Sequence, residues 1–223
     1  MNKNIFGDNP VMNFLTTLCD IVILHFLWLL TSIPVFTIGA STTALYYTTM
    51  KCIRNGQGGV VKLFFKSFRE NFKQASALGL LFLLAGAICA FDLSYAIKAG
   101  LNILLIIFTI MTFVFVSCAF YLFPLEAQFE NTIKGTIRNS LLMSIKHLPW
   151  TLLLLVITVV MLAMAYFSSA ILGLMLIIGV GLHAYLCSLV FVHIFNAYMP
   201  EEEDKDDADF HIVLPDDKTE DQN

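Results

Sequence analysis

Long apolar runs separated by polar connections dominate the chain and predict transmembrane helices. Each of five runs is long enough to cross the roughly 30 Å hydrocarbon core of a bilayer, which takes about 20 helical residues. The runs cover residues 14–36, 75–96, 101–125, 149–170 and 172–197. We therefore predict an all-α fold, a polytopic transmembrane helical bundle of about five spans. The first run exceeds a secretory signal core in length and follows a single lysine, Lys3, so we expect it to stay in the mature protein.

The apolar stretch around the first run is too long for one crossing and contains a break. Residues 21–50 carry no charge and would extend about 45 Å as one helix. Pro34 removes a helical hydrogen-bond donor and Gly39 frees the backbone. We therefore predict a separate helix over 40–54, either at the cytoplasmic interface or dipping partly into the membrane. The break, which includes Thr37, is a candidate functional segment as well as a structural one.

Two of the connections contain amphipathic segments. Residues 60–73 carry Phe64 and Phe68 on an apolar face. The opposite, basic face consists of Lys62, Lys66, Arg69 and Lys73. Residues 129–147 repeat the pattern more weakly, with a stripe of Phe129, Ile133, Ile137, Leu141 and Ile145. Such helices suit the anionic inner membrane surface or a docking partner. The named phenylalanines and basic residues of 60–73 are therefore candidate partner or lipid contacts.

The same two segments indicate an internal repeat. Sliding the first segment by 76 residues aligns Asn71-Phe72 with His147-Leu148, and each pair directly precedes an apolar run. Parallel repeats occur in transporters, although generic membrane-protein composition also produces them. Asn71 and Phe72 are accordingly candidate functional residues at a polar hinge.

Composition excludes an ordinary soluble enzyme and divides the chain in two. The chain is 58% hydrophobic and 13% charged, against about 25% charged in a typical soluble domain. Residues 1–199 carry a net charge of +5, from eleven basic and six acidic residues, whereas residues 200–223 carry −9, from two lysines and eleven acids. We predict a transmembrane domain over 1–199 and an acidic, disordered cytoplasmic tail over 200–223.

The acidic tail contains a short apolar segment, residues 210–215 (FHIVLP). Such a segment can fill a groove or add to a sheet edge. The tail either solubilises the cytoplasmic end of the protein, or folds back on the basic cytoplasmic residues, or binds a partner there.

The distribution of positive charge predicts the orientation in the cell membrane. Nine Lys or Arg residues lie in the connections 37–74 and 126–148, and two lie on the other side. The positive-inside rule places both connections in the cytoplasm. With five crossings, this multi-pass protein has its N-terminus outside and its C-terminus in the cytoplasm.

Three acids lie in or beside the apolar runs. Asp20 and Asp92 are candidate functional residues because intramembrane charge is costly. We expect both near the outer leaflet, either hydrogen-bonded locally, or paired with Lys98 or lining a substrate vestibule. Glu126, just after Pro124, is interpreted as the end of the third run at the inner interface.

The chain contains no pattern that indicates catalysis, a cofactor or a metal. His183 and Cys187 are one helical turn apart, but no third ligand follows at a useful spacing. His25, His183 and His193 are interpreted as packed, hydrogen-bonded histidines. The motifs GxxxxGK[ST], HExxH and GxSxG are absent from the sequence. We predict no enzyme activity and no nucleic-acid partner, since the basic helices are strongly apolar on their reverse faces.

Small residues at helical spacing predict close contacts between spans. Ala75 and Gly79 form one such pair, and Gly181 and Ala184 lie near one another in the last run with Gly173. These positions pack the bundle internally or dock a partner.

Several motifs resemble the YesL family of bacterial membrane proteins. They are Leu27-Trp28, residues 33–39 (IPVFTIG), 43–47 (TALYY) and 64–68 (FFKSF), Asn71-Phe72, residues 121–125 (YLFPL) and Gln128-Phe129. The resemblance extends over about residues 5–197 and implies a roughly five-span protein without a settled activity. Genes of this family often neighbour those for carbohydrate ABC importers and sensor kinases, which implies a role near sugar uptake.

Two functional hypotheses follow. The leading one is a non-enzymatic accessory component of carbohydrate ABC import or of its regulation, in contact with the permease or ATPase subunits. The alternative is an autonomous small transporter or channel that forms a homo-oligomer, which rests on the break after Pro34, the membrane acids and the repeat.

Overall fold

The computed structural model describes residues 10–56 and 59–198, and these residues form helices and no strand. In chain order the elements are α1 (Pro10–Thr31), the 3-10 helix η1 (Val35–Thr37), α2 (Ile38–Asn55), α3 (Val60–Glu70), α4 (Phe72–Ala99), α5 (Asn102–Gln128), α6 (Ile133–Lys146), α7 (Leu148–Phe167) and α8 (Ser169–Asn196). The predicted acidic tail over 200–223 lies outside the described residues. The all-α prediction is confirmed.

Five of the described helices, α1, α4, α5, α7 and α8, are long and apolar enough to cross a membrane. They correspond to the five predicted runs, so the predicted number of spans is confirmed within the described chain. The first span ends at Thr31 rather than at residue 36, because the chain leaves helical geometry before Pro34, whose backbone is extended at φ −74° and ψ 117°.

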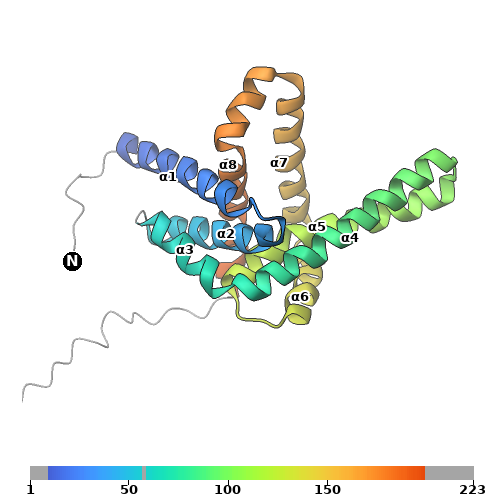
Figure 1. The fold of residues 1–223 in the computed structure, drawn as a ribbon, viewed down its shortest axis with the longest axis horizontal. Coiled ribbons are helices and arrows are strands. Elements are labelled where there is room, and N and C mark those ends of the chain that lie inside the picture. The colour runs from blue at the N-terminus through green and yellow to red at the C-terminus, as the bar shows by residue number, and fades with distance from the viewer. Residues whose placement is uncertain (1–9, 57–58, 199–223) are drawn as a thin grey trace, which may run out of the picture.

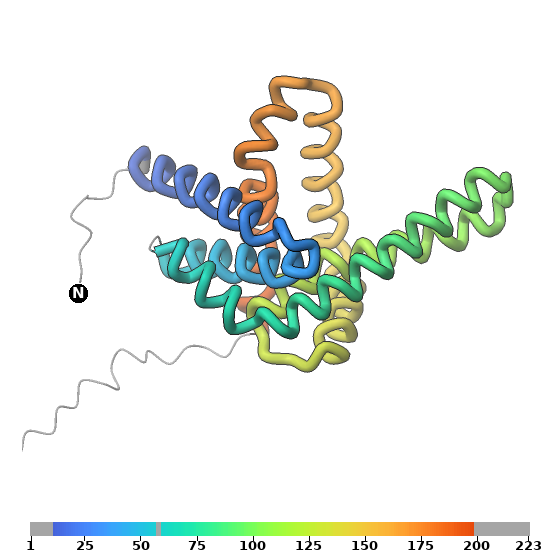
Figure 2. The backbone as a smooth tube through the Cα atoms, in the orientation of Figure 1, coloured from blue at the N-terminus to red at the C-terminus, as the bar shows by residue number. Residues whose placement is uncertain are grey.

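The helices are arranged as three arms that project from a common base (Figure 1). We call base the region formed by α2, α3, α6 and the adjoining ends of the long helices. The arms are α1, the α4–α5 hairpin and the α7–α8 hairpin, and Figure 2 shows the chain leaving and re-entering the base twice. Apolar side chains near the arm tips are largely exposed, among them Ile103 at 76% and Phe167 at 85%. Exposed apolar surface of this extent suits contact with lipid.

The base is built around α2, which is enclosed by α1, α3, α4, α5 and α8. More than half of its residues are buried. The predicted separate helix is confirmed, and protein rather than lipid surrounds it. Most of its buried hydroxyls are bonded locally or to a neighbour: Thr48 donates to the Ala44 carbonyl at 2.8 Å, and Thr49 lies 2.8 Å from the Ser188 hydroxyl on α8. The buried Thr43 hydroxyl is the exception in α2, with no hydrogen-bond partner among the described residues. A helix of modest hydropathy can therefore occupy the core.

The segment from Pro34 to Gly39 is a tight turn followed by a close helix contact. The Thr37 hydroxyl, 4% exposed as a residue, lies 2.6 Å from the carbonyl oxygens of both Thr31 and Pro34 and so closes the turn. The prediction that Gly39 frees the backbone is wrong, because Gly39 lies inside α2 in helical geometry. Its missing side chain instead allows α4 to approach, since a Cβ atom at Gly39 would lie 2.9 Å from the Gly79 Cα.

Both halves of the chain follow the same local plan around a hinge residue. Asn71 separates α3 from α4, and His147 separates α6 from α7. Each hinge donates its backbone N–H to the residue four positions before it, at 3.0 and 2.9 Å, and each carbonyl accepts from the residue four positions after it. A hairpin of two long helices then follows in both cases. The structure thus shows the short-helix, hinge and span unit in both places where the sequence predicts it.

Small residues allow close contacts of one arm with the base and of two arms with each other. Ala75 and Gly79 face Gly39, and a Cβ atom at Gly181 on α8 would overlap the Ile21 carbonyl oxygen and lie 3.2 Å from His25 on α1. Gly173, by contrast, has nothing within 4 Å of its Cβ position. Two of the predicted small-residue contacts therefore lie between helices of one chain.

Candidate functional site at the base

Part of the apolar face of α3 is turned into the protein, while Val61 and Phe65 on the same face are exposed. Phe64 is 0% exposed and belongs to the hydrophobic core, so its prediction as a partner or lipid contact is wrong. Phe68 is half-buried against that core, and its ring is stacked on Phe64 at 6.3 Å and lies edge-on to Phe72 at 5.4 Å between ring centres. The reason is that α3 packs directly on α2, which an amphipathic pattern alone does not reveal.

The basic face of α3 is exposed, as predicted. Lys62, Lys66, Arg69 and Lys73 all lie on the surface. Lys66 pairs with Glu70 at 3.9 Å, one helical turn away. An exposed pair of this kind contributes roughly 0–1 kcal/mol to stability, so the face is available for anionic lipid or an acidic partner.

The second amphipathic helix, α6, is oriented opposite to the expectation from its aliphatic stripe. Its buried side is small and polar: Thr136 and Ser140 are 0% exposed and Ser144 is 2% exposed. Leu141 and Ile145 face outward, at 37% and 58%. Small hydroxyl side chains let α6 approach α5 closely. Ser140 donates to the Thr136 carbonyl of its own helix at 2.6 Å, whereas the Thr136 hydroxyl donates to Glu126 on α5.

The outward side of α6 combines apolar and basic residues. Lys134, Arg138, Leu141 and Ile145 recur at helical spacing and are all exposed. We call this set the α6 outer face. A surface of this composition binds either an anionic lipid headgroup layer or a protein segment that carries both apolar and acidic side chains.

A polar cavity of about 850 Å³ lies between α2, the hinge at Asn71 and the connection from α5 to α6. Its lining includes the carboxyl groups of Glu70, Glu126 and Glu130 and the carboxamides of Asn71, Gln74, Gln128 and Asn131. Tyr47 closes it from α2, and its hydroxyl lies 3.3 Å from the Lys51 Nζ. Such a lining can hydrogen-bond a polar solute.

Glu126 is the buried centre of this polar region. The residue is 5% exposed, and its Oε2 accepts hydrogen bonds from the Thr136 hydroxyl at 2.9 Å and from the Gln74 amide at 3.1 Å. Gln74 also donates to the Asn131 carbonyl. These contacts join α4, α5 and α6. Glu126 thus does more than end a span, because it connects the two repeated units.

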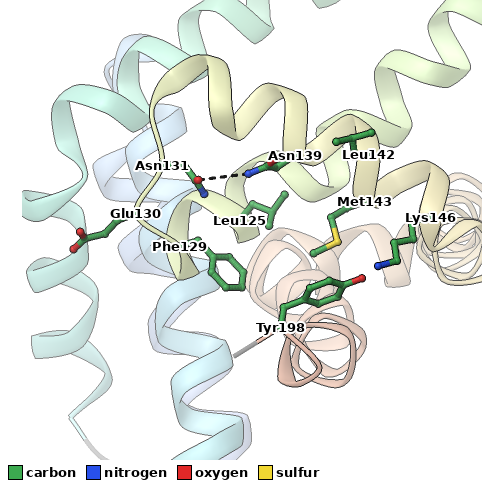
Figure 3. A pocket seen from close by; sticks show the side chains of 9 residues that line it. All are labelled: Leu125, Phe129, Glu130, Asn131, Asn139, Leu142, Met143, Lys146 and Tyr198. Atoms are coloured by element: carbon green, nitrogen blue, oxygen red, sulfur yellow. Dashed lines mark hydrogen bonds between the residues drawn. The ribbon is translucent and has the colours of Figure 1, made fainter. Parts of the chain in front are cut away.

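A second cavity, of about 520 Å³, lies on the other side of the α5–α6 connection (Figure 3). We call it the α6 pocket. Phe129, Leu142 and Met143 supply apolar walls, and Lys146 and Tyr198 lie together at one end. Asn139 lies at another edge, where its amide donates to the Asn131 side-chain oxygen at 3.4 Å. The pocket is therefore an apolar groove whose rim carries Lys146 at one end.

Tyr198, the last described residue, is held at this rim by three contacts. Its hydroxyl lies 2.8 Å from the His147 Nε2, and its ring meets the His147 ring edge-on at 5.9 Å. The Lys146 Nζ lies 4.9 Å from the centre of the Tyr198 ring. Because His147 and Lys146 form the α6–α7 hinge, the end of the described chain is fixed beside the pocket.

The two predicted membrane acids lie apart from this region and from each other. Asp20 borders a cavity of about 50 Å³ with Thr17, Thr49 and Tyr185. Asp92 is half-buried on the outer part of α4, and the described structure records no ion pair within 4.0 Å between it and Lys98.

His25 and His183 are packed and hydrogen-bonded as predicted, whereas His193 is exposed and makes a ring contact. The His25 Nε2 lies 2.9 Å from the Leu176 carbonyl oxygen, and the His183 Nε2 lies 2.9 Å from the Thr158 hydroxyl. His193 packs its ring 5.0 Å from Trp150. Among the described residues, no three His, Cys, Asp or Glu side chains come together as a metal site.

Sequence reasoning did not identify Gln74 or Tyr198 as part of a site. Gln74 lies in a stretch that is typical of the start of a span, and Tyr198 directly follows the last apolar run. The local sequence pattern therefore predicts no contact partner for either residue. The only signal is that Glu126 is the single acid within α5, and a lone acid at a span end predicts an interface as readily as a network.

Comparisons with known proteins place the chain among proteins without an assigned activity. Residues 21–93 match the family described as protein of unknown function, DUF624. The chain is 35% identical over 142 residues to the uncharacterized protein YteU of Bacillus subtilis (strain 168), a match that covers 60% of this chain and 64% of YteU. It is 23% identical over 150 residues to the uncharacterized protein YesL of the same organism, covering 66% of this chain and 72% of YesL. No solved structure matches the chain. The chain therefore spans slightly less than two thirds of YteU, and these matches confirm the resemblance to a YesL-like family of unsettled function.

Proposed function

We propose that this YesL-like membrane protein is a non-enzymatic accessory component that docks on a carbohydrate ABC importer, or on its regulatory apparatus, through the base. The observation that carries the proposal is the α6 outer face, where Leu141 and Ile145 are exposed on the turns that follow the exposed Lys134 and Arg138. The carbohydrate link rests on the family resemblance, and the matched relatives are themselves uncharacterized.

The proposed orientation puts the base in the cytoplasm. Both basic helices, α3 and α6, belong to the base and lie on the side of the molecule opposite the α7–α8 turn (Figure 1). The positive-inside rule then directs the base inward and the three arm tips outward. In this orientation the base is within reach of the ATPase subunits and of the cytoplasmic loops of a permease.

The repeated architecture supports a scaffold rather than a chemical step. The buried polar groups bond one another across helices, as Glu126 does with Gln74 and Thr136, and so fix the base in one arrangement. A rigid base that displays an apolar and basic helix face is suited to partner recognition. The proposal therefore assigns the protein no catalytic residue.

The test is purification of the tagged protein from its native membrane in mild detergent, with quantification of permease and ATPase subunits. We expect stoichiometric recovery from the unaltered protein and loss of recovery from the double variant Lys134→Glu, Arg138→Glu. The matched control is Lys62→Glu, Lys66→Glu, which makes the same change of charge on α3. Equal loss from both variants would assign the attraction to net charge and contradict a specific α6 contact.

A second candidate function is favoured by the polar cavity of about 850 Å³ beside Glu126. A small transporter or channel needs such a cavity, and a homo-oligomer would complete its pathway. Purification would then yield only copies of this chain, and flux in proteoliposomes would fall in the Glu126→Gln variant. Flux that is insensitive to Glu126, Asp20 and Asp92 would exclude a pathway through these acids.

A further inference from the structure

The α6 pocket lies where the described chain ends, and 25 residues follow it in the sequence. Tyr198 is itself part of the pocket lining. Its contacts with His147 and Lys146 hold the chain at the rim. Whatever follows Tyr198 therefore starts at the mouth of an apolar groove of about 520 Å³.

The segment that follows matches the groove in side-chain character. Residues 210–214 (FHIVL) are an apolar segment within an otherwise acidic stretch. In extended conformation Phe210, Ile212 and Leu214 point to the same side, because side chains alternate along an extended chain. The pocket offers Phe129, Leu142 and Met143 to such a row.

The segment also matches the surroundings of the groove in charge. Residues 200–223 carry −9, from two lysines and eleven acids. Lys146 lies in the pocket lining, and Lys134 and Arg138 are exposed outside the lining on the same helix, which makes α6 as a whole basic. Glu130 is the one acid in the lining, and Figure 3 shows its side chain lying apart from Phe129, Met143 and Tyr198.

The chain between Tyr198 and the apolar segment is long enough for the segment to reach the α6 pocket and short enough to keep it nearby. Eleven residues, 199–209, lie between Tyr198 and Phe210 in the sequence. This stretch reaches at most about 40 Å when extended and averages roughly 20 Å as a flexible chain. A groove beside the anchor point lies well within this range. Attachment through such a short tether gives an effective concentration of the order of millimolar.

We propose that the α6 pocket is the binding site of this chain's own C-terminal segment, residues 210–214, with Phe210, Ile212 and Leu214 inserted between α5, α6 and the end of α8. The acidic residues on both sides of the segment face the basic residues of α6. The inference does not depend on the importer proposed above, because it concerns contacts within one chain.

The experiment is a cysteine-pair scan in the full-length protein. Leu142, exposed at the pocket edge, is changed to Cys and combined in turn with Ala208→Cys, Val213→Cys or Gln222→Cys. Cys19 and Cys52 are replaced beforehand, whereas Cys89, Cys118 and Cys187 are buried and stay. The rate of intrachain disulfide formation under mild oxidant is measured for each pair.

The rate of disulfide formation depends differently on cysteine position for a tethered chain without a binding site and for a docked chain. Without docking, the rate declines steadily by roughly fourfold from position 208 to position 222, following the −3/2 power of tether length. Docking predicts a maximum at position 213, at least about threefold above position 208, against the trend that tether length imposes. A steady decline would overturn the proposal.

A neutral variant provides the control for specificity. The triple change Phe210→Ser, Ile212→Ser, Leu214→Ser leaves the charge of the tail and the described helices unaltered, and it is expected to abolish the maximum. Persistence of the maximum would contradict insertion of these side chains. Mixing two chains of different tag length shows whether the disulfide joins one chain or two, and a predominantly interchain product would overturn the proposal in favour of a second copy.

Discussion

The contact between Gly39 on α2 and Gly79 on α4 predicts that a single added methyl group destabilises the base. A Cβ atom at Gly39 would lie 2.9 Å from the Gly79 Cα and 3.0 Å from the Ala75 carbonyl carbon, and it would overlap the Ala75 carbonyl oxygen. Carbon atoms pack favourably at about 3.5–4.0 Å. The two helices must therefore separate by roughly 1 Å, because the obstructing atoms are backbone and cannot rotate away.

The expected loss of stability for Gly39→Ala follows from two opposing terms. Overpacking of a close-packed contact costs about 1–3 kcal/mol, and more when backbone must move. Replacing a helical glycine by alanine gains up to about 1 kcal/mol in helix propensity. The net expectation is a loss of about 1–2 kcal/mol. Gly173→Ala is the matched control, because nothing lies within 4 Å of its Cβ position, and it is expected to be neutral or slightly stabilising.

The assay is reversible unfolding in mixed micelles of mild detergent and dodecyl sulfate, followed by helical circular dichroism and by tryptophan fluorescence. Trp28 is a suitable reporter, since its indole N–H donates to the Thr42 hydroxyl on α2 at 3.0 Å. Adding Gly79→Ala to Gly39→Ala should cost less than the sum of the two single changes, because one separation of the helices accommodates both methyl groups. Equal stability of the Gly39→Ala and Gly173→Ala proteins would refute the reasoning.

Three further predictions concern the base. Glu126→Leu leaves the buried Thr136 hydroxyl without its acceptor and should lower the free energy of unfolding by about 1–3 kcal/mol, whereas Glu126→Gln retains an acceptor and should cost less, as the same unfolding assay will show. Ser140→Leu should destabilise the protein by about 1–3 kcal/mol through overpacking against α5, while Leu141→Ser should have little effect; the reverse order would mean that the aliphatic side of α6 is the packed one. Burial, with the charge of Lys146 beside it, lowers the pKa of His147 below its usual 6.5. Protonation of His147 therefore opposes its contact with Tyr198, and this contact weakens as the pH falls below 6.5. Amide hydrogen exchange near the end of α8, corrected for intrinsic rates, should therefore be faster at low pH, and a His147→Gln protein that keeps the same pH dependence would contradict this cause.

The number and type of the helices could be predicted from the sequence because each signal is local. A run of about 20 apolar residues has few alternatives to a span. Pro34 favours a helix end before it, as observed for α1, although α5 continues through Pro124. The hinge residues Asn71 and His147 were likewise visible, since each marks the end of an amphipathic pattern and the start of an apolar run. These features require knowledge of one segment at a time.

The arrangement of the base could not be predicted because it depends on pairs of distant segments. Gly39 reads as a helix breaker on its own, and only the presence of Gly79 and Ala75 opposite it shows that it is a packing position. The role of Glu126 depends on hydrogen bonds from Gln74, 52 residues earlier, and from Thr136, ten residues later. Neither partner carries a charge that would have indicated an attraction.

The two amphipathic helices show most clearly what a hydrophobic pattern leaves undetermined. Both have one apolar face, yet α3 turns its Phe64 side into the protein, whereas α6 turns Thr136 and Ser140 inward and Leu141 outward. In water the apolar face would be buried in both cases. At a membrane surface lipid can cover an apolar face, so close approach through small side chains decides which side meets the protein. Because α6 is packed through its hydroxyl side, the α6 outer face is left for lipid or a partner. The α6 pocket beside it is lined by other residues of the helix, and the cysteine-pair profile tests whether the chain's own C-terminal segment binds there.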